Sequence, residues 1–217
     1  MPVDGPVYPV NLLVAGRRVL VIGGGRVAAE KARGLLHAGA VVHVVAPEVG
    51  EEVRSLGVTW DQRPYERGEV AGYRLAVACT DDPTTNQAVF DDGEAAGVWV
   101  NAADDPERCS YTLPARLDRG RVLVTVSTGG HSPALATWLR DQLAGHVGEE
   151  VDTLAGLLAE ARADLLAEGR SSLGANWRTA LDSGMLDLVR AGRTDEAREL
   201  LRATLHPADP SHPGSQP

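Results

Sequence analysis

The sequence predicts an α/β protein: a Rossmann-like, doubly wound parallel sheet, then a small α+β segment and a helical C-terminal domain. Two observations predict the sheet. Short apolar runs alternate with helical periods over the first hundred residues, and a glycine-rich turn follows the first of these runs. The helical domain is predicted by a composition rich in Ala, Leu, Glu and Arg from Glu149 onward.

The elements of the predicted sheet alternate in chain order. Continuous apolar runs, typical of strands buried on both faces, lie at residues 19–22, 41–46, 75–79 and 98–101. A further strand at 58–62 is expected at an edge of the sheet. The intervening segments predict helices at residues 26–38, 49–55 and 84–96.

The second half of the chain follows a different pattern. An extended piece at 112–116 and a strand at 122–126 precede a helix that starts at Ser132-Pro133 and runs to about Ala144. Helical periods then predict helices at residues 151–168, 177–182, 185–191 and 194–205. The expected domains are residues 1–111, 112–147 and 148–205, followed by a tail at 206–217 that is predicted to be disordered.

Charge and composition narrow the class of protein. The net charge of −9 argues against a nucleic-acid partner, because phosphate binding needs clustered Lys and Arg. No apolar run is long enough to span a membrane, and the N-terminus has no basic and apolar stretch typical of a signal peptide. The two cysteines, Cys79 and Cys109, are too few for a disulfide framework. We therefore expect a soluble, cytoplasmic protein.

The turn after the first strand carries the clearest motif. Gly23-Gly24-Gly25-Arg26-Val27-Ala28 fits G-x-G-x-x-A, placed directly after a strand and opening a helix. Gly23 permits the tight turn, Gly25 lets a pyrophosphate approach the backbone, and Ala28 allows close packing of helix on strand. The motif predicts dinucleotide binding; the alternative is a tight turn with a purely structural role.

The end of the second strand bears on the choice of dinucleotide. An acid there would bind the adenosine ribose, and Glu48, after Pro47, is the candidate, although it lies slightly beyond the usual place. Residues 44–50 contain no Arg or Lys to receive a 2′-phosphate, which favours NAD over NADP. The alternative interpretation of Glu48 as a solvated loop acid stays open.

Polar residues also follow the third and fourth apolar runs. Thr80 ends one run, and Asn101 opens the sequence Asn-Ala-Ala-Asp that ends at Asp104. Since ligands of open α/β sheets bind at the carboxyl ends of strands, these residues are candidates for the same site. The alternative is turn chemistry, for which Asp and Asn are favoured.

A second distinctive segment surrounds the loop Ser127–Pro133. Four arginines and one aspartate give residues 111–140 a net charge of +3 within an acidic chain. This predicts an anion site for a polycarboxylate; alternatively, the arginines pair with surface acids and His131 is an ordinary loop residue. The candidate substrate-binding residues are Arg116, Arg119, Thr128, Gly129, Gly130, His131 and Ser132.

Taken together, these motifs resemble a known family. They occur in order at residues 8–9, 16–28, 30–32, 78–82, 101–104, 113–115 and 127–136. The chain resembles the precorrin-2 dehydrogenase/sirohydrochlorin ferrochelatase family, the N-terminal module of siroheme synthases, over about residues 6–145. The resemblance implies NAD-dependent oxidation of precorrin-2 to sirohydrochlorin, and, in bifunctional members, insertion of Fe²⁺ to give siroheme.

The resemblance also implies roles for single residues. Asp104 is the implied catalytic acid–base group for both reactions, and the pairs Arg26-Val27 and Pro47-Glu48 are implied dinucleotide contacts. We add Gly23, Gly24, Gly25, Thr80 and Asn101 to the cofactor-binding set. The family position of Thr128 is in some members a serine that can be phosphorylated. A homodimer formed through residues 112–145 is expected, and the segment 112–147 is expected to bind substrate.

The chemistry leaves some alternatives open. A carboxylate near the nicotinamide is a plausible base for the proton that accompanies hydride loss, and no His/Cys cluster predicts a dedicated metal site. Whether ferrochelatase activity is present, and whether the metal is iron or cobalt, stays open. A non-catalytic NAD-sensing regulatory module would also explain Gly23–Ala28. An ordinary small-molecule dehydrogenase is disfavoured, because the Tyr/Lys pair typical of many such enzymes needs a lysine and Lys31 is the only one.

Overall fold

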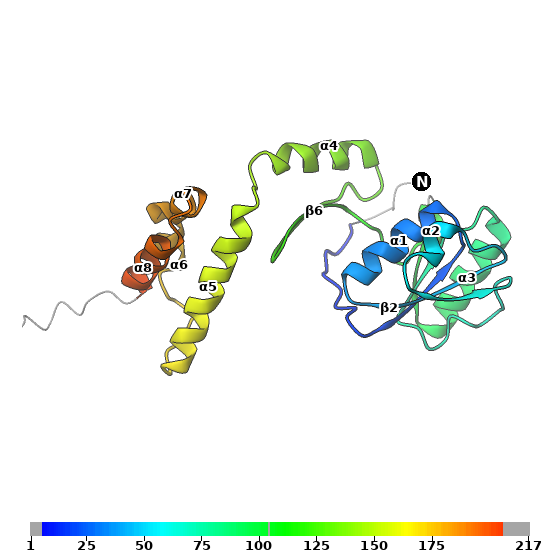
Figure 1. Cartoon of the computed structure of the whole chain (residues 1–217). Coiled ribbons are helices and arrows are strands. Elements are labelled where there is room, and N and C mark those ends of the chain that lie inside the picture. The colour runs from blue at the N-terminus through cyan, green and yellow to red at the C-terminus, as the bar shows by residue number, and fades with distance from the viewer. Residues whose placement is uncertain (1–5, 104, 206–217) are drawn as a thin grey trace, which may run out of the picture. The chain divides into compact units, whose positions relative to one another are not determined.

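The computed structural model describes residues 6–103 and 105–205, so Asp104 and the tail predicted to be disordered lie outside the described residues. The chain divides into two compact units (Figure 1). The first runs to Pro114 and includes Ser127–Pro133; the second comprises Ala115–Val126 and the chain from Ala134 onward. The division into domains at residues 111 and 147 stays a prediction.

The first unit is a five-stranded parallel sheet with helices on both faces. Its elements are, in chain order, β1 (Arg18–Ile22), α1 (Arg26–His37), β2 (Val41–Ala46), α2 (Glu51–Arg54), β3 (Thr59–Gln62), β4 (Leu75–Ala78), α3 (Pro83–Ala96) and β5 (Trp99–Ala102). The strand order is β3-β2-β1-β4-β5, with every neighbouring pair parallel. The predicted Rossmann-like fold is therefore confirmed, and β3 is an edge strand as expected.

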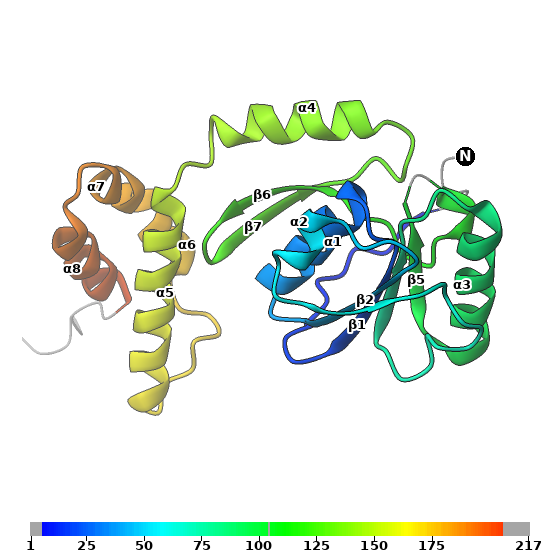
Figure 2. The ribbon, with the colours of Figure 1, turned by 45° about the vertical axis from the view of Figure 1, so that its right-hand side comes forward.

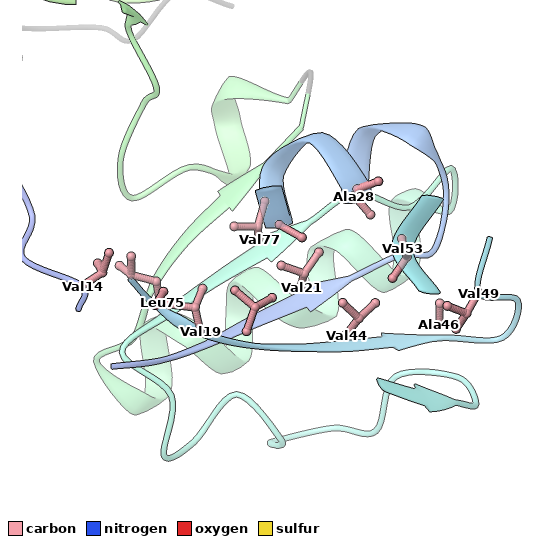
Figure 3. Packing of buried hydrophobic residues seen from close by; sticks show 14 residues of the cluster. Val14, Val19, Val21, Ala28, Val44, Ala46, Val49, Val53, Leu75 and Val77 are labelled. Atoms are coloured by element: carbon pink, nitrogen blue, oxygen red, sulfur yellow. The ribbon is translucent and has the colours of Figure 1, made fainter. Parts of the chain in front are cut away.

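Two apolar clusters, one on each face, explain the continuous apolar runs. Val19 and Val21 of β1 pack with the alanines of α1 and with Val53 of α2 (Figure 3). Leu20 and Ile22, which point the other way, pack in a second cluster with Val89 of α3. Helices α1 and α2 thus cover one face and α3 the other (Figure 2). Each buried Val, Leu or Ile side chain contributes about 1.5–3 kcal/mol to folding.

The buried face of α1 consists of small residues. Ala28, Ala29 and Ala32 are fully buried against the sheet, so the helix axis approaches the strands closely. This is the packing that the last position of G-x-G-x-x-A requires. The N-terminus of α1 is consequently fixed directly above the end of β1.

On the face of the sheet covered by α3, the carboxylate of Asp92 in α3 holds the loop that follows β3 by hydrogen bonds. It accepts hydrogen bonds from the Tyr65 hydroxyl at 2.8 Å, the Gly68 backbone N–H at 2.7 Å and the Arg67 guanidinium at 2.6 Å. The Arg67 hydrogen bond is the largest of the effects that hold the pKa of Asp92 below its usual range. Burial, together with the bond to Asp92, raises the pKa of Tyr65.

Replacing Asp92 with alanine is expected to lower the free energy of unfolding by about 1–3 kcal/mol, because the half-buried Tyr65 hydroxyl loses its acceptor. Since the pKa of Asp92 is lower in the folded state, its carboxylate stabilises the fold fully above about pH 4. That stabilisation is lost as the pH falls further. Urea titrations from pH 6 to pH 3 should show a smaller loss of stability for Asp92→Asn than for the wild type. Asp91→Asn, at the exposed neighbouring position, is the control, and an equal acid response of both variants would contradict the assignment.

The second unit contains a hairpin and a helical bundle. The strands β6 (Ala115–Arg119) and β7 (Val122–Val126) pair antiparallel. The helices are α4 (Pro133–Ala144), α5 (Glu150–Ala167), α6 (Trp177–Ala180), α7 (Leu186–Arg190) and α8 (Thr194–Leu205). A π-helical turn, Leu181–Met185, joins α6 to α7, with Gly184 at φ +93°. The two helices predicted at 177–191 are thus one kinked helical stretch.

The helical bundle has an apolar core of its own. Leu157 and Leu165 of α5, Met185, and Leu201 of α8 are almost fully buried in one cluster. None of the helices within residues 6–103 and 105–205 is both long enough and apolar enough to cross a membrane.

Candidate functional site

The predicted cofactor residues of the first unit lie along the carboxyl edge of the parallel sheet. Gly23–Gly25 follow β1, Pro47-Glu48 follow β2, Thr80 follows β4, and Asn101 lies near the end of β5. The strand order reverses between β1 and β4, and such a switch point opens the crevice in which α/β proteins bind ligands. The fold therefore brings these residues to one edge.

The first two glycines of the turn are required by the protein backbone itself. Gly23 has φ +121°, its N–H donates to the Val45 carbonyl at 2.9 Å, and a Cβ here would collide with the Cys79 carbonyl oxygen. A Cβ on Gly24 would collide with the carbonyl oxygen of Glu48. The Gly24 carbonyl in turn accepts a hydrogen bond from Gly50 N–H at 2.9 Å. The turn is thus locked between the ends of β2 and β4.

Gly25 differs from its two neighbours because nothing in the described chain requires a glycine there. Its φ of −87° is open to any L-residue, and a Cβ would meet no atom within 4 Å. Gly25 is exposed, and it is the N-cap of α1 without a side-chain hydrogen bond to the helix. The missing side chain leaves open space in front of the first-turn amides, which are a ready-made phosphate site. The turn therefore fits the pyrophosphate of a dinucleotide, with Arg26 and Val27 in the first turn of the helix.

Pro47 and Glu48 are both exposed directly beyond β2. The carbonyl of Glu48 packs against Gly24, so its backbone adjoins the glycine turn. This places Glu48 where an acid could bind a ribose next to the pyrophosphate. Binding of the ribose by Glu48 stays a prediction.

The loop after β4 is held by a buried side chain that the sequence analysis missed. Asn86 of α3 is buried, accepts from the Thr80 hydroxyl at 2.7 Å and donates to the Thr80 carbonyl at 3.0 Å. Asp82 caps α3 by accepting from Thr84 N–H at 3.0 Å, and hydrogen bonds from the Thr85 hydroxyl and from the Thr84 backbone lower the pKa of Asp82. Thr80 therefore lies at the edge with its hydroxyl engaged inside the protein. A polar residue at an inward position of the helix, four residues after Asp82, was the available signal.

Asn101 also has an internal role. Its buried amide donates to the Tyr111 carbonyl at 2.9 Å and bridges the end of β5 to the returning chain. The structure thus uses Asn101 as a brace at the edge of the sheet, and its contact with a cofactor stays a prediction. Asn86 and Asn101 are the two buried polar side chains in the described part of the chain, and both support crevice loops.

The turn that follows β5 is braced as well. The carboxylate of Asp105 forms an ion pair with Arg108, which belongs to a short 3₁₀ turn at Pro106–Arg108. Arg108 Nε donates to Gln87 Oε1 of α3 at 2.7 Å. The Cys109 thiol donates to the Ala102 and Asp105 carbonyls, and burial raises its pKa. The Asp105 carboxylate therefore has a structural role in this turn. The predicted catalytic residue, Asp104, lies outside the described residues.

The predicted anion loop, Ser127–Pro133, is closed by its own hydrogen bonds. The Thr128 hydroxyl donates to the Ser132 carbonyl at 3.1 Å and accepts from Ser132 N–H at 3.0 Å. Gly129 and Gly130 both have positive φ, at 58° and 81°, while Gly130 and His131 are exposed. The Thr128 hydroxyl thus shapes the loop, and the exposed groups at its tip are Gly130 and His131.

The arginines of the second unit do not form one cluster. Arg116 and Arg119 are three residues apart on β6, so their side chains leave opposite faces of the hairpin. Arg119 pairs with Glu149 at 3.1 Å, and Arg121 and Arg140 pair with Asp152 and Asp141 at 2.9 and 2.7 Å. Pairing with surface acids therefore accounts for three of the four arginines. Arg116 is exposed and makes no ion pair with a described residue, so it is the best remaining candidate for a substrate carboxylate.

Comparisons with known proteins agree with the nucleotide-binding fold of the first unit. A family model described as "Putative NAD(P)-binding" matches residues 10–115. The siroheme synthase of Azotobacter vinelandii is 40% identical over 201 residues, which cover 90% of this chain and 43% of that protein. The siroheme synthase of Pseudomonas fluorescens is 37% identical over 205 residues, with coverages of 92% and 44%. The chain thus spans less than half the length of these curated relatives.

A solved structure matches nearly the whole fold. The structure titled "SirC, precorrin-2 dehydrogenase" superposes with a TM-score of 0.71 at 25% identity, covering 90% of this chain and 99% of that one. The chain belongs to the precorrin-2 dehydrogenase/siroheme synthase family. The predicted resemblance is therefore confirmed, and it extends into the helical bundle, where the sequence carried no diagnostic motif. In this family member, no group of three His, Cys, Asp or Glu side chains within the described ranges could hold a metal ion.

Proposed function

We propose that this chain is an NAD-dependent dehydrogenase that oxidises precorrin-2 to sirohydrochlorin in siroheme synthesis. The observation that carries the proposal is the open space at Gly25 before the first turn of α1, in a fold shared along almost its full length with a precorrin-2 dehydrogenase. The siroheme synthase relatives point to the same pathway. The proposed compartment is the cytoplasm.

The reaction removes a hydride and a proton from precorrin-2. NAD, when bound, accepts the hydride. The first-turn amides of α1 bind the pyrophosphate, and Glu48 bonds to the adenosine ribose. The loop held by Thr80 and Asn86 lies at the carboxyl end of β4, on the same edge of the sheet. Asp104, which follows β5, is the proposed base that takes the proton.

The same carboxylate is proposed to assist metal insertion in a second reaction. Insertion of Fe²⁺ into sirohydrochlorin displaces two pyrrole protons, which need an acceptor. Iron is here a substrate whose final ligands are the nitrogens of the macrocycle. Arg116 and the exposed loop tip at Gly130-His131 are the proposed contacts for substrate carboxylates.

The direct test is to incubate the purified chain with precorrin-2 and NAD, and then with Fe²⁺, following the absorbance of the tetrapyrrole and of NADH. Stoichiometric NADH formation with conversion to sirohydrochlorin is expected. NAD binding without any turnover would contradict the proposal and favour the alternative, a non-catalytic NAD-sensing module. A spectral change with Fe²⁺ and added sirohydrochlorin, but none with precorrin-2 and NAD, would indicate a chelatase without dehydrogenase activity.

We also propose that the protein is a homodimer whose contact is formed by residues 112–145. The hairpin β6–β7 is an isolated two-stranded sheet with two open edges, which is rarely stable unless covered. Leu123 on the hairpin and Leu135 and Trp138 on α4 are about half exposed. Large exposed apolar side chains in one segment are typical of an interface.

Light scattering at micromolar concentration is therefore expected to give about twice the chain mass of 22.9 kDa. Trp138→Glu should shift the protein to a monomer, because a charge in the centre of the contact would be buried without a partner. Leu173→Glu, at a largely exposed apolar residue outside this segment, is the control and should stay dimeric. A monomeric wild type would overturn the proposal.

A further inference from the structure

We propose that Arg54, stacked on Trp60, forms the platform on which the adenine ring of the dinucleotide lies. The inference rests on the proposed use of NAD and adds a base-recognition element to that site. Residues 44–50 contain no Arg or Lys. The fold nevertheless places the guanidinium of Arg54, the last residue of α2, beside the backbone of Val49.

Three contacts fix the plane of the Arg54 guanidinium. Its Nε donates to the Val49 carbonyl at 2.9 Å, and Nη2 donates to Gln62 Oε1 at 3.1 Å. Its central carbon lies 4.7 Å from the centroid of a Trp60 ring, in a cation–π contact. Arg54 and Trp60 are both exposed, so the guanidinium is held in place while remaining accessible to solvent.

The position of the platform follows the path expected of an adenosine. The pyrophosphate lies at Gly25, and the ribose lies at the acid that follows β2. The base must then continue in the same direction, past β2 toward β3, the last strand on this side of the sheet. Val49 follows β2 by three residues and Gln62 is the last residue of β3, so both anchors of Arg54 lie at this carboxyl edge.

The chemistry of the platform favours a flat base over a phosphate. A guanidinium plane stacks on aromatic rings, so adenine, guanidinium and indole would form three layers. The Nε–H and one Nη2–H of Arg54 already donate hydrogen bonds to Val49 and Gln62, so fewer donors remain for a phosphate. Glu48, Glu51 and Glu52 also lie in the same short segment, and their charge opposes a 2′-phosphate. The platform therefore serves NAD, and it explains why a cation here does not imply NADP.

Calorimetric titrations of the full chain with NAD, ADP-ribose and NADP would test the platform. Arg54→Ala is expected to weaken the binding of NAD and ADP-ribose by the same factor, about tenfold, since one stacking contact is lost from both. Arg54→Lys should lose as much, because it keeps the charge and loses the plane. Arg33→Ala, an exposed arginine on α1, is the control and should bind as the wild type does.

Unchanged binding of NAD by Arg54→Ala would overturn the platform, and so would a loss confined to NADP, which would identify Arg54 as a phosphate ligand. Retention of affinity by Arg54→Lys would show that charge alone matters and would also overturn it. Circular dichroism of each variant checks the fold. A wild type that binds NAD but does not oxidise precorrin-2 would reject the proposed function and leave the platform standing. An Arg54→Ala variant with wild-type NAD affinity and full turnover would reject the platform and leave the proposed function standing.

Discussion

Replacing Gly25 with valine is expected to abolish dinucleotide binding and leave the fold intact. The backbone at Gly25 has dihedral angles open to any L-residue, and its added Cβ would meet no protein atom within 4 Å. The valine side chain would instead occupy the space before the first turn of α1. A pyrophosphate could then no longer reach the amides of Arg26 and Val27. The loss of two charge-assisted hydrogen bonds, about 1.5–3 kcal/mol each, raises the Kd for NAD about 100-fold or more.

Gly24→Ala is the matched control, since it adds one methyl group at the adjacent position. Its Cβ would collide with the backbone carbonyl of Glu48, which cannot move without displacing the end of β2. We expect this variant to lose about 1–3 kcal/mol of stability, as overpacked positions do. Calorimetry with NAD and urea unfolding separate the two effects. Normal NAD binding by a folded Gly25→Val would place the nucleotide elsewhere.

The sheet could be predicted from the sequence because its strands are buried on both faces. Val19, Leu20, Val21 and Ile22 belong alternately to two apolar clusters, and only a continuous apolar run satisfies both. The glycine turn could also be predicted from the sequence. A side chain at Gly23 or Gly24 would collide with the backbone, and Gly25 leaves open space before the helix. Local constraints of this kind determine the residue type at the constrained position itself, so they can be recognised in the sequence.

Contacts that depend on the pairing of strands were harder to predict from the sequence. Nothing near Arg54 in the sequence indicates that its guanidinium joins Val49 to Gln62, because that geometry depends on the pairing of β2 with β3. Asn86 was missed although a local signal was available, since it is a polar residue at an inward position of α3 and its partner Thr80 lies just before the helix. The separation of Arg116 from Arg119, by contrast, follows from the two-residue period of a strand and could have been derived from the predicted extended segment.

Asp104 and Asp105 are expected to differ sharply in turnover, although they are adjacent after the same strand. The family resemblance gives Asp104 the role of base, and a positioned base contributes about 10²–10⁴ in rate. Asp104→Ala should therefore lose precorrin-2 oxidation by that factor while its affinity for NAD stays within a few-fold. Stopped assays of NADH formation and calorimetry with NAD measure the two quantities on the same preparation.

Asp105→Ala is the matched control, and the structure supplies the reason for its expected mild effect. The Asp105 carboxylate is engaged by Arg108, so it is held as part of the turn and is not available as a base. Removing it leaves Arg108 bonded to Gln87, and the Cys109 thiol still bonds to the backbone at Ala102 and Asp105. The turn should thus keep its position and turnover should stay near that of the wild type. Equal losses in the two variants would mean that the aspartates act as a unit through Arg108. Full activity of Asp104→Ala would remove the carboxylate from the mechanism and leave the proton to solvent.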